Sequence, residues 1–169
     1  SANLDELILG AYQAVADPGS YRNYLARLGA ELGGHIVALH DEALRHQSDQ
    51  VVMTVGLDES EYLDLQARYS EFAHENLWMQ RAATRLMRDG VVDSADVCDH
   101  REMAQTNYFI RVLRPIDIDH SLGILLSSDP QHQAVLTINR AGVDRPFTSA
   151  HHDLVRRLRP HLVQAFRMM

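Results

Sequence analysis

The sequence predicts an α+β fold in which one antiparallel β-sheet of about five strands is sandwiched by helices. Two pairs of short, β-branched-rich runs, within residues 35–55 and 116–140, each enclose a polar connection, as antiparallel strand pairs do. Apolar residues recur at helical spacing before, between and after these pairs. Strands and helices do not alternate one by one, which argues against a parallel sheet.

The length and composition indicate one folded domain, expected over residues 3–169. A chain of 169 residues with 46% apolar residues can form a real hydrophobic core. Ser1 and Ala2 resemble a remnant of expression and are left out of the predicted domain. The sequence has no signal peptide and no membrane-length apolar run, and its single cysteine suits a reducing compartment. We therefore expect a soluble cytoplasmic domain that does not associate with membranes.

The first half of the chain predicts two helices. Asn3, with Glu6 three residues later, resembles a capping box at the start of a helix that ends at Asp17-Pro18-Gly19. Ser20 is expected to cap a second helix, which Gly33-Gly34 ends.

A strand pair and a third helix come next. Residues 35–40 and 51–55 are the predicted strands, joined by a polar ten-residue connection. Asp58 and Glu61 have the spacing of a second capping box, which should open a helix carrying Leu65.

The middle of the chain predicts two more helices and a short strand. Asn76 should begin a helix that ends at Asp89-Gly90, and Val91-Val92 is expected to form an edge strand. Thr106 should cap a helix that stops before Pro115, because a proline restricts the residue before it.

The second strand pair and the last helix complete the chain. Residues 116–126 and 133–140 are predicted strands, and the first is apolar enough to be covered on both faces. Thr148 is the expected N-cap of a helix over residues 148–169. No Gly or Asn follows the last periodic residue, so we expect this helix to lead into a further segment.

Several motifs resemble the sensor domain of LuxR-type transcriptional regulators. They are Val55-Gly56-Leu57, Asn76-Leu77-Trp78, Tyr108-Phe109, Leu113-Arg114-Pro115, Phe147-Thr148, Leu154 and the run from Arg156 to Leu162. The resemblance covers about residues 4–169 and implies a PAS/GAF-like fold that binds a small-molecule effector. In this family the last helix continues into a helix-turn-helix domain, so we expect DNA to be bound through an adjoining domain beyond residue 169. The net charge of −7 argues against nucleic acid binding by this chain itself.

Aromatic residues on the helices between the two strand pairs are the candidate ligand site. The predicted lining consists of Tyr62, Tyr69, Phe72, Trp78, Tyr108 and Phe109, with His120, and also His40, as polar contacts from the strands. The alternative is that these rings only fill the core.

The residues of the candidate site do not identify the small-molecule effector that the resemblance implies. Receptors of acyl-homoserine lactones in this family carry Asp-Pro where this chain has Asn76-Leu77. An Asn can accept a hydrogen bond from a ligand, but without charge assistance. A lactone ligand is therefore doubtful.

Homodimerisation through the first and last helices is also predicted. The last helix carries an apolar stripe of Leu154, Leu158, Leu162 and Phe166, which should form the dimer and signal helix. The alternative function is a ligand-free dimerisation or protein-interaction module.

Catalysis, metals and cofactors are not predicted. The sequence lacks a phosphate loop, a nucleophile elbow and paired metal-binding motifs. His151-His152 and Cys98-Asp99-His100 contain side chains that can bind metals, but adjacent helical residues point about 100° apart and seldom bind one ion together. A small enzyme on a GAF-like scaffold stays as a third hypothesis, and it would need clustered, perturbed ionisable groups in a cleft.

Overall fold

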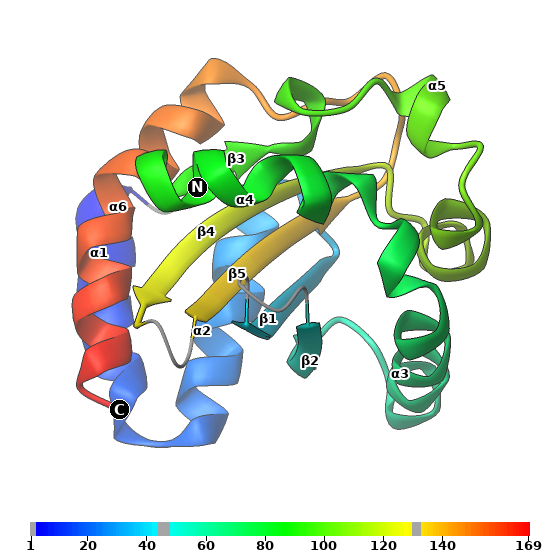
Figure 1. Cartoon of the computed structure of the whole chain (residues 1–169). Coiled ribbons are helices and arrows are strands. Elements are labelled where there is room, and N and C mark those ends of the chain that lie inside the picture. The colour runs from blue at the N-terminus through cyan, green and yellow to red at the C-terminus, as the bar shows by residue number, and fades with distance from the viewer. Residues whose placement is uncertain (1–2, 44–47, 130–132) are drawn as a thin grey trace.

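A five-stranded antiparallel sheet forms the centre of the computed structural model, which describes residues 3–43, 48–129 and 133–169 (Figure 1). Among these residues the strands are β1 (Ile36–Ala43), β2 (Ser48–Val55), β3 (Val91–Asp93), β4 (His120–Ser128) and β5 (Gln133–Arg140), in the order β2-β1-β5-β4-β3. The longer helices are α1 (Leu4–Gln13), α2 (Pro18–Glu31), α3 (Glu59–Phe72), α4 (Leu77–Asp89) and α6 (Ser149–Arg167). The predicted α+β class with one antiparallel sheet is confirmed.

Short helical segments connect these elements. They are η1 (Ala14–Ala16), η2 (Ala73–Glu75), η3 (Ser94–Asp96), α5 (His100–Met103), the π-helical η4 (Phe109–Leu113) and η5 (Arg114–Ile116). Thr106 caps the segment that contains η4 by accepting a hydrogen bond from the Phe109 backbone N–H at 3.1 Å. That helical path continues through Pro115, because proline is tolerated in the first turn of the following 3₁₀ segment.

Most predicted helix starts are confirmed by their caps. The side chain of Asn3 accepts from the Glu6 N–H at 2.8 Å, and the Asp58–Glu61 capping box makes both of its hydrogen bonds. The prediction for the start of α2 is wrong by three residues. Asp17, not Ser20, is the N-cap, because its carboxylate accepts from the Ser20 N–H and Pro18 occupies the first turn.

The strands differ from the prediction mainly in where they begin and end. β1 and β2 extend into the expected polar connection and pair as far as Ala43 and Ser48, while residues 44–47 lie outside the described part of the chain. β4 begins at His120 because η5 precedes it and Asp117 adopts a left-handed conformation with φ of 55°. The polar connection expected within the second strand pair is described only up to Asp129.

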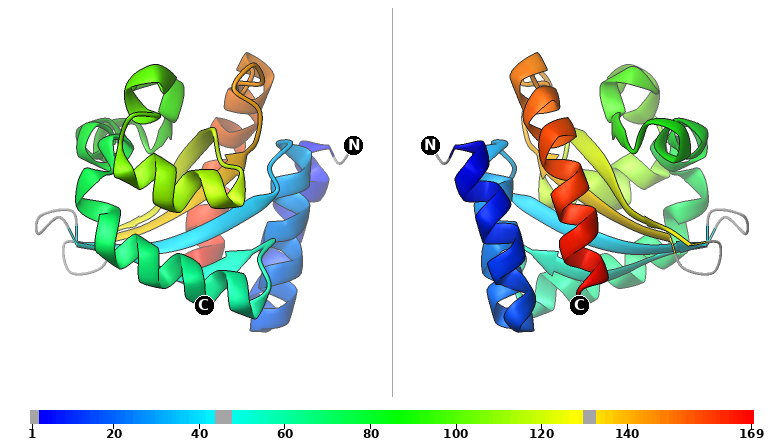
Figure 2. Two further views of the ribbon diagram at one scale, coloured as in Figure 1. Left: turned by 90° about the vertical axis from the view of Figure 1, so that its right-hand side faces the viewer. Right: turned by 90° about the vertical axis from the view of Figure 1, so that its left-hand side faces the viewer.

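The two faces of the sheet are covered by different sets of helices. α1, α2 and α6 cover one face, and α3, α4, α5 and η4 lie over the other (Figure 2). The face covered by α1, α2 and α6 is hereafter called the filled face. There Leu122, Ile124, Leu136 and Ile138 are completely buried against leucines from all three helices. Large aliphatic side chains therefore close this layer.

The apolar stripe of α6 belongs to this layer. Leu158 is 0% exposed and Leu162 is 4% exposed, while Leu154 and Phe166 are partly buried against the same cluster. Leu7 and Ala11 of α1 are buried there too. Leu158 and Leu162 are therefore buried against the sheet of their own chain, while a dimer that involves the partly buried Leu154 and Phe166 stays a prediction.

Truncating Leu158 should destabilise the chain itself. For Leu158→Ala we expect a loss of about 2 to 5 kcal/mol in the free energy of unfolding, because a cavity opens in a closed layer. Leu9→Ala on α1, where the side chain is 58% exposed, should change it by less than about 0.5 kcal/mol. Urea unfolding measures both. Unchanged stability with a loss of dimer mass for Leu158→Ala would contradict this assignment.

Candidate functional site

A cavity lies between the second face of the sheet and the helices α3, α4 and η4. It offers about 860 Å³ of space between atoms, part of it continuous with solvent. Side chains from β1, β4 and β5 form its floor, and aromatic and aliphatic residues of the helices form its walls. A mainly apolar and aromatic lining with a few polar side chains is typical of sites that hold small molecules.

Small residues at the centre of the floor create this space. Strand pairing places Ala38 of β1, Thr137 of β5 and Gly123 of β4 side by side in one row across the sheet. Ala82 and Ala83 of α4 line the cavity from the helical side. Small residues at these positions leave space that large apolar side chains occupy on the filled face.

The floor also carries a hydrogen-bonded polar group. Thr137 Oγ1 lies 3.1 Å from His40 Nε2 and accepts a hydrogen bond from Asn139 Nδ2 at 3.0 Å. His40 and Asn139 are only 8% and 6% exposed. This network orients three polar side chains in a mainly apolar cavity.

The start of α4 forms one wall. Asn76 is the N-cap and accepts from the Met79 N–H at 3.3 Å, so its side chain is fixed while it lines the cavity. Trp78, in the first turn, lines the same wall. The capping signal that predicted this helix therefore also positions a polar side chain at the site.

Three of the predicted aromatic residues line the cavity, namely Tyr69, Trp78 and Tyr108. The rings of Tyr69 and Tyr108 meet edge to face with centroids 5.9 Å apart, and the Tyr69 ring lies 6.1 Å from that of His40. The sequence thus brings aromatic side chains of α3 and of the helical segment at η4 together over the floor.

The other predicted aromatic residues pack beside the cavity without lining it. Tyr62 donates its hydroxyl hydrogen to the Val51 carbonyl at 3.3 Å, and Phe72 packs against the surrounding core. Phe109 is buried between His100, at a centroid distance of 5.3 Å, and the guanidinium of Arg114. These three side chains support the walls.

The structure places His120 on the opposite face of the sheet. His120 pairs with Arg140 on β5, and its Nε2 lies 2.9 Å from the Val143 carbonyl oxygen. Its neighbour Ser121 faces the cavity instead. His120 is thus not part of this cavity, since alternate residues of a strand face opposite sides.

The sequence interpretation missed most of the floor. Ala38, Gly123, Thr137 and Asn139 are small or polar residues at inward positions of strands that are otherwise rich in Val, Ile and Leu. Such interruptions at every second position could have indicated a cavity, because a closed core favours large apolar residues there.

No carboxylate, lysine or arginine is found among the described residues that line the cavity. Two groups outside the cavity have shifted pKa values. Burial raises the pKa of Tyr21, on the filled face, to about 12, and burial likewise raises the pKa of the Cys98 thiol. The raised thiol pKa disfavours the reactive thiolate.

The paired histidines at the start of α6 have separate roles. His151 completes a capping box, because its Nδ1 accepts from the Thr148 N–H at 3.1 Å. His152 Nε2 lies 2.7 Å from the carboxylate of Asp93, which is 4% exposed at the end of β3. In the described residues no three His, Cys, Asp or Glu side chains are grouped so that they could hold a metal ion.

A second polar contact joins α6 to the same edge of the sheet. Arg159 Nε donates to the Leu125 carbonyl of β4 at 2.9 Å, and burial lowers the pKa of this guanidinium. Leu125 N–H in turn donates to the Gly90 carbonyl at 2.8 Å. Two side chains of α6, His152 and Arg159, are therefore bonded to the strands β3 and β4 at this edge of the sheet. On the opposite face of the sheet, Val92 of β3 and Gly123 of β4 line the cavity.

Solved structures share this fold. The ligand-binding domain of VqsR from Pseudomonas aeruginosa is 16% identical with a TM-score of 0.72, covering 97% of this chain and 94% of that one. CepR2 from Burkholderia cenocepacia is a LuxR family transcription factor dependent on N-acylhomoserine lactone. It is 13% identical with a TM-score of 0.64, and the match covers 98% of this chain and 94% of that one. The phycocyanobilin-bound GAF domain of a cyanobacterial phytochrome is 12% identical with a TM-score of 0.62, and the match again covers 98% of this chain and 94% of that one.

These likenesses show a GAF-like fold, also found in LuxR-type ligand-binding domains. No protein family model matches the chain, and no curated protein matches it. Among the described residues, no helix combines the length and the apolar character needed to cross a membrane.

Removing the Thr137 hydroxyl should weaken the floor. Thr137→Val keeps the shape but leaves the His40 and Asn139 groups without their shared partner, and we expect a loss of about 1 to 3 kcal/mol in the free energy of unfolding. Thr137→Ser, which keeps the hydroxyl, should lose less. Urea unfolding compares the two variants, and equal losses would show that the hydroxyl network contributes nothing.

Proposed function

We propose that this chain is the ligand-sensing regulatory domain of a LuxR-type transcriptional regulator, with a small molecule bound between the sheet and the helices. The observation that carries the proposal is the cavity between sheet and helices, with its aromatic walls and its hydrogen-bonded polar floor. A fold in common with the VqsR ligand-binding domain supports it. DNA would be contacted through an adjoining domain.

The open cavity favours ligand sensing over a ligand-free interaction module. A module whose aromatic residues were only structural would close its core on both faces of the sheet, as α1, α2 and α6 do on the filled face. A homodimer remains part of the proposal. It would use the outer surfaces of the helices, because Leu158 and Leu162 of α6 are buried within one chain.

The signal would pass to α6 through the β3–β4 edge. Val92 and Ser94, which flank Asp93, line the cavity and would contact a ligand there, and the Asp93 carboxylate is bonded to His152 of α6. The Arg159 contact to Leu125 provides a second connection. A ligand that favours one position of this edge would therefore favour one position of α6.

The transcription-factor part of the proposal is tested by the encoding gene. We expect about sixty residues with a helix-turn-helix pattern to be encoded after the Met169 codon, because α6 would lead into that domain. Sequencing downstream of this codon provides the measurement. A stop codon directly after it would remove the DNA-binding part and leave a stand-alone binding protein.

The proposed route of the signal predicts a change in hydrogen exchange. Binding of the uncharged fluorescent dye phenylnaphthylamine should slow exchange of backbone amides in β3 and in the first turns of α6, measured by mass spectrometry. In the His152→Ala variant, the dye should still bind, but it should no longer slow the exchange of backbone amides in α6.

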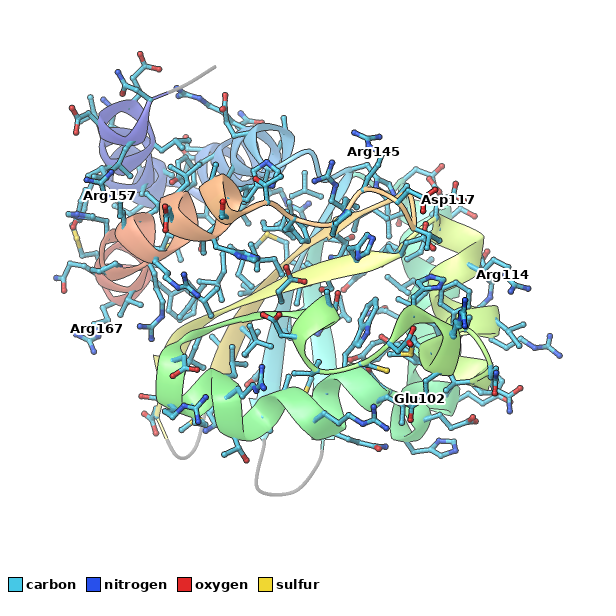
Figure 3. All side chains as sticks on the ribbon, turned by 90° about the horizontal axis from the view of Figure 1, so that it is seen from above. Glu102, Arg114, Asp117, Arg145, Arg157 and Arg167 are labelled. Atoms are coloured by element: carbon cyan, nitrogen blue, oxygen red, sulfur yellow. The ribbon has the colours of Figure 1, made fainter. Side chains whose placement is uncertain are left out.

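Arg157→Ala is the matched control for this variant. Arg157 lies on the same helix, is exposed and points away from the body of the chain, so the response should be unchanged (Figure 3). Full protection of α6 in His152→Ala would refute the route through Asp93.

A further inference from the structure

We infer that the cavity takes an uncharged, mainly apolar molecule that carries a hydrogen-bond acceptor such as a carbonyl or ether oxygen. The inference rests on the proposed function, namely that this cavity binds a small molecule. It narrows the ligand to one chemical class and assigns the acceptor to the wall formed by α3 and the start of α4.

The first step concerns charge. The described lining residues include no carboxylate, lysine or arginine, so the cavity has no permanent charge that could pair with an ionic ligand. Nearby charged side chains, such as Arg114 after η4, are exposed at the periphery (Figure 3). Burying an unpaired carboxylate, phosphate or ammonium group costs far more than burying a neutral polar group. The cavity should therefore reject ions.

The second step concerns hydrogen-bond donors. Tyr69 lines the cavity from α3 and is 5% exposed, and Asn76 lines it from the start of α4 and is 6% exposed. Within the described part of the chain, the Tyr69 hydroxyl and the Asn76 Nδ2 have no acceptor, although the Asn76 oxygen is used as a cap. The indole N–H of Trp78 on the same wall also lacks one there. Donors that lack acceptors are best satisfied by oxygen atoms of a ligand.

The third step concerns the position of the apolar part. The floor row of Ala38, Thr137 and Gly123 faces a layer that includes Ala82 and Ala83. A Cβ added at Gly123 would lie in ordinary van der Waals contact with atoms of Val92, Leu86 and Val135 at 3.7 to 3.9 Å, so a methyl group would fit there and a larger side chain would extend into the cavity. The apolar body of the ligand fits between these two small-residue surfaces.

Two dyes that share one ring system test the charge step. Phenylnaphthylamine is uncharged, and anilinonaphthalene sulfonate is the same molecule with an added sulfonate. At about pH 8, where an ordinary imidazole is neutral, fluorescence titration should show at least about tenfold tighter binding of the uncharged dye. Ala82→Lys, which places an ammonium group at the cavity, should shift the preference toward the sulfonate.

Variants that fill the cavity localise the binding. Gly123→Leu should abolish binding of phenylnaphthylamine, with folding checked by circular dichroism, and Ala82→Leu provides the same test from the helical side. Leu63→Ala, an exposed position on α3, should bind as the unmodified chain does. Dye binding that survives in both folded filling variants would place the dye elsewhere and overturn the inference.

The acceptor step is tested by displacement of the bound dye. Methyl decanoate should displace it better than undecane, which lacks an acceptor, and better than decanoate, which is charged. Asn76→Ser keeps an N-capping side chain but removes the amide donor, so it should reduce the advantage of the ester over the alkane. Equal displacement by ester and alkane in the unmodified chain would overturn the acceptor assignment.

The outcomes separate this inference from the proposed function. If the sulfonate dye binds as tightly as the uncharged dye in the cavity, the charge argument is wrong and a ligand-binding domain remains. If neither dye nor any of the aliphatic compounds binds, the cavity is not a ligand site, and both proposals fall together.

Discussion

The antiparallel pairing of β1 with β5 is the constraint on which the rest of the structure depends. It joins residues 36–42 to residues 133–139, so a segment from the first third of the chain and one from the last third lie side by side within the sheet. One face of this pair presents Leu39, Leu136 and Ile138, and the other presents Ala38, Thr137 and His40. A shift of one residue in this register would exchange the two sets. Stability and the candidate site thus depend on the same hydrogen-bonded ladder.

The difference between the two faces separates packing from binding. On the filled face, large aliphatic residues of the sheet meet leucines of α1, α2 and α6, and this layer is closed. On the other face the central row is small, so aromatic rings of the helices surround a space instead of filling it. Because closing one layer suffices to anchor the helices of that side, the other layer can stay open.

Local signals predicted the helices well, since a cap is decided within four residues. Asn3, Asp58, Asn76 and Thr148 all cap as their sequences indicated. The failure at α2 is of the same local kind, because Asp17 and Ser20 are both good caps and Pro18 decides between them.

Features that depend on the register of strands could not be read from the sequence in this way. His120 and Ser121 are adjacent in a strand that is apolar on both faces, so nothing local shows which of them faces the cavity. The stripe of α6 was likewise visible, but only the sheet shows that Leu158 is buried within the chain and not between two chains. Part of the site, namely Tyr69, Trp78 and Tyr108, followed from composition, while its floor required the pairing of β1, β4 and β5.

The position of β3 explains how a ligand on one face could influence a helix on the other. β3 is an edge strand that pairs over only three residues, so moving it breaks fewer hydrogen bonds than moving β1 or β5 would. Its residues alternate between the two faces, with Val92 toward the cavity and Asp93 toward α6. A displacement of Val92 by a ligand therefore moves the carboxylate that holds His152. Under the proposed function, this short strand is where binding energy becomes a change in the position of α6.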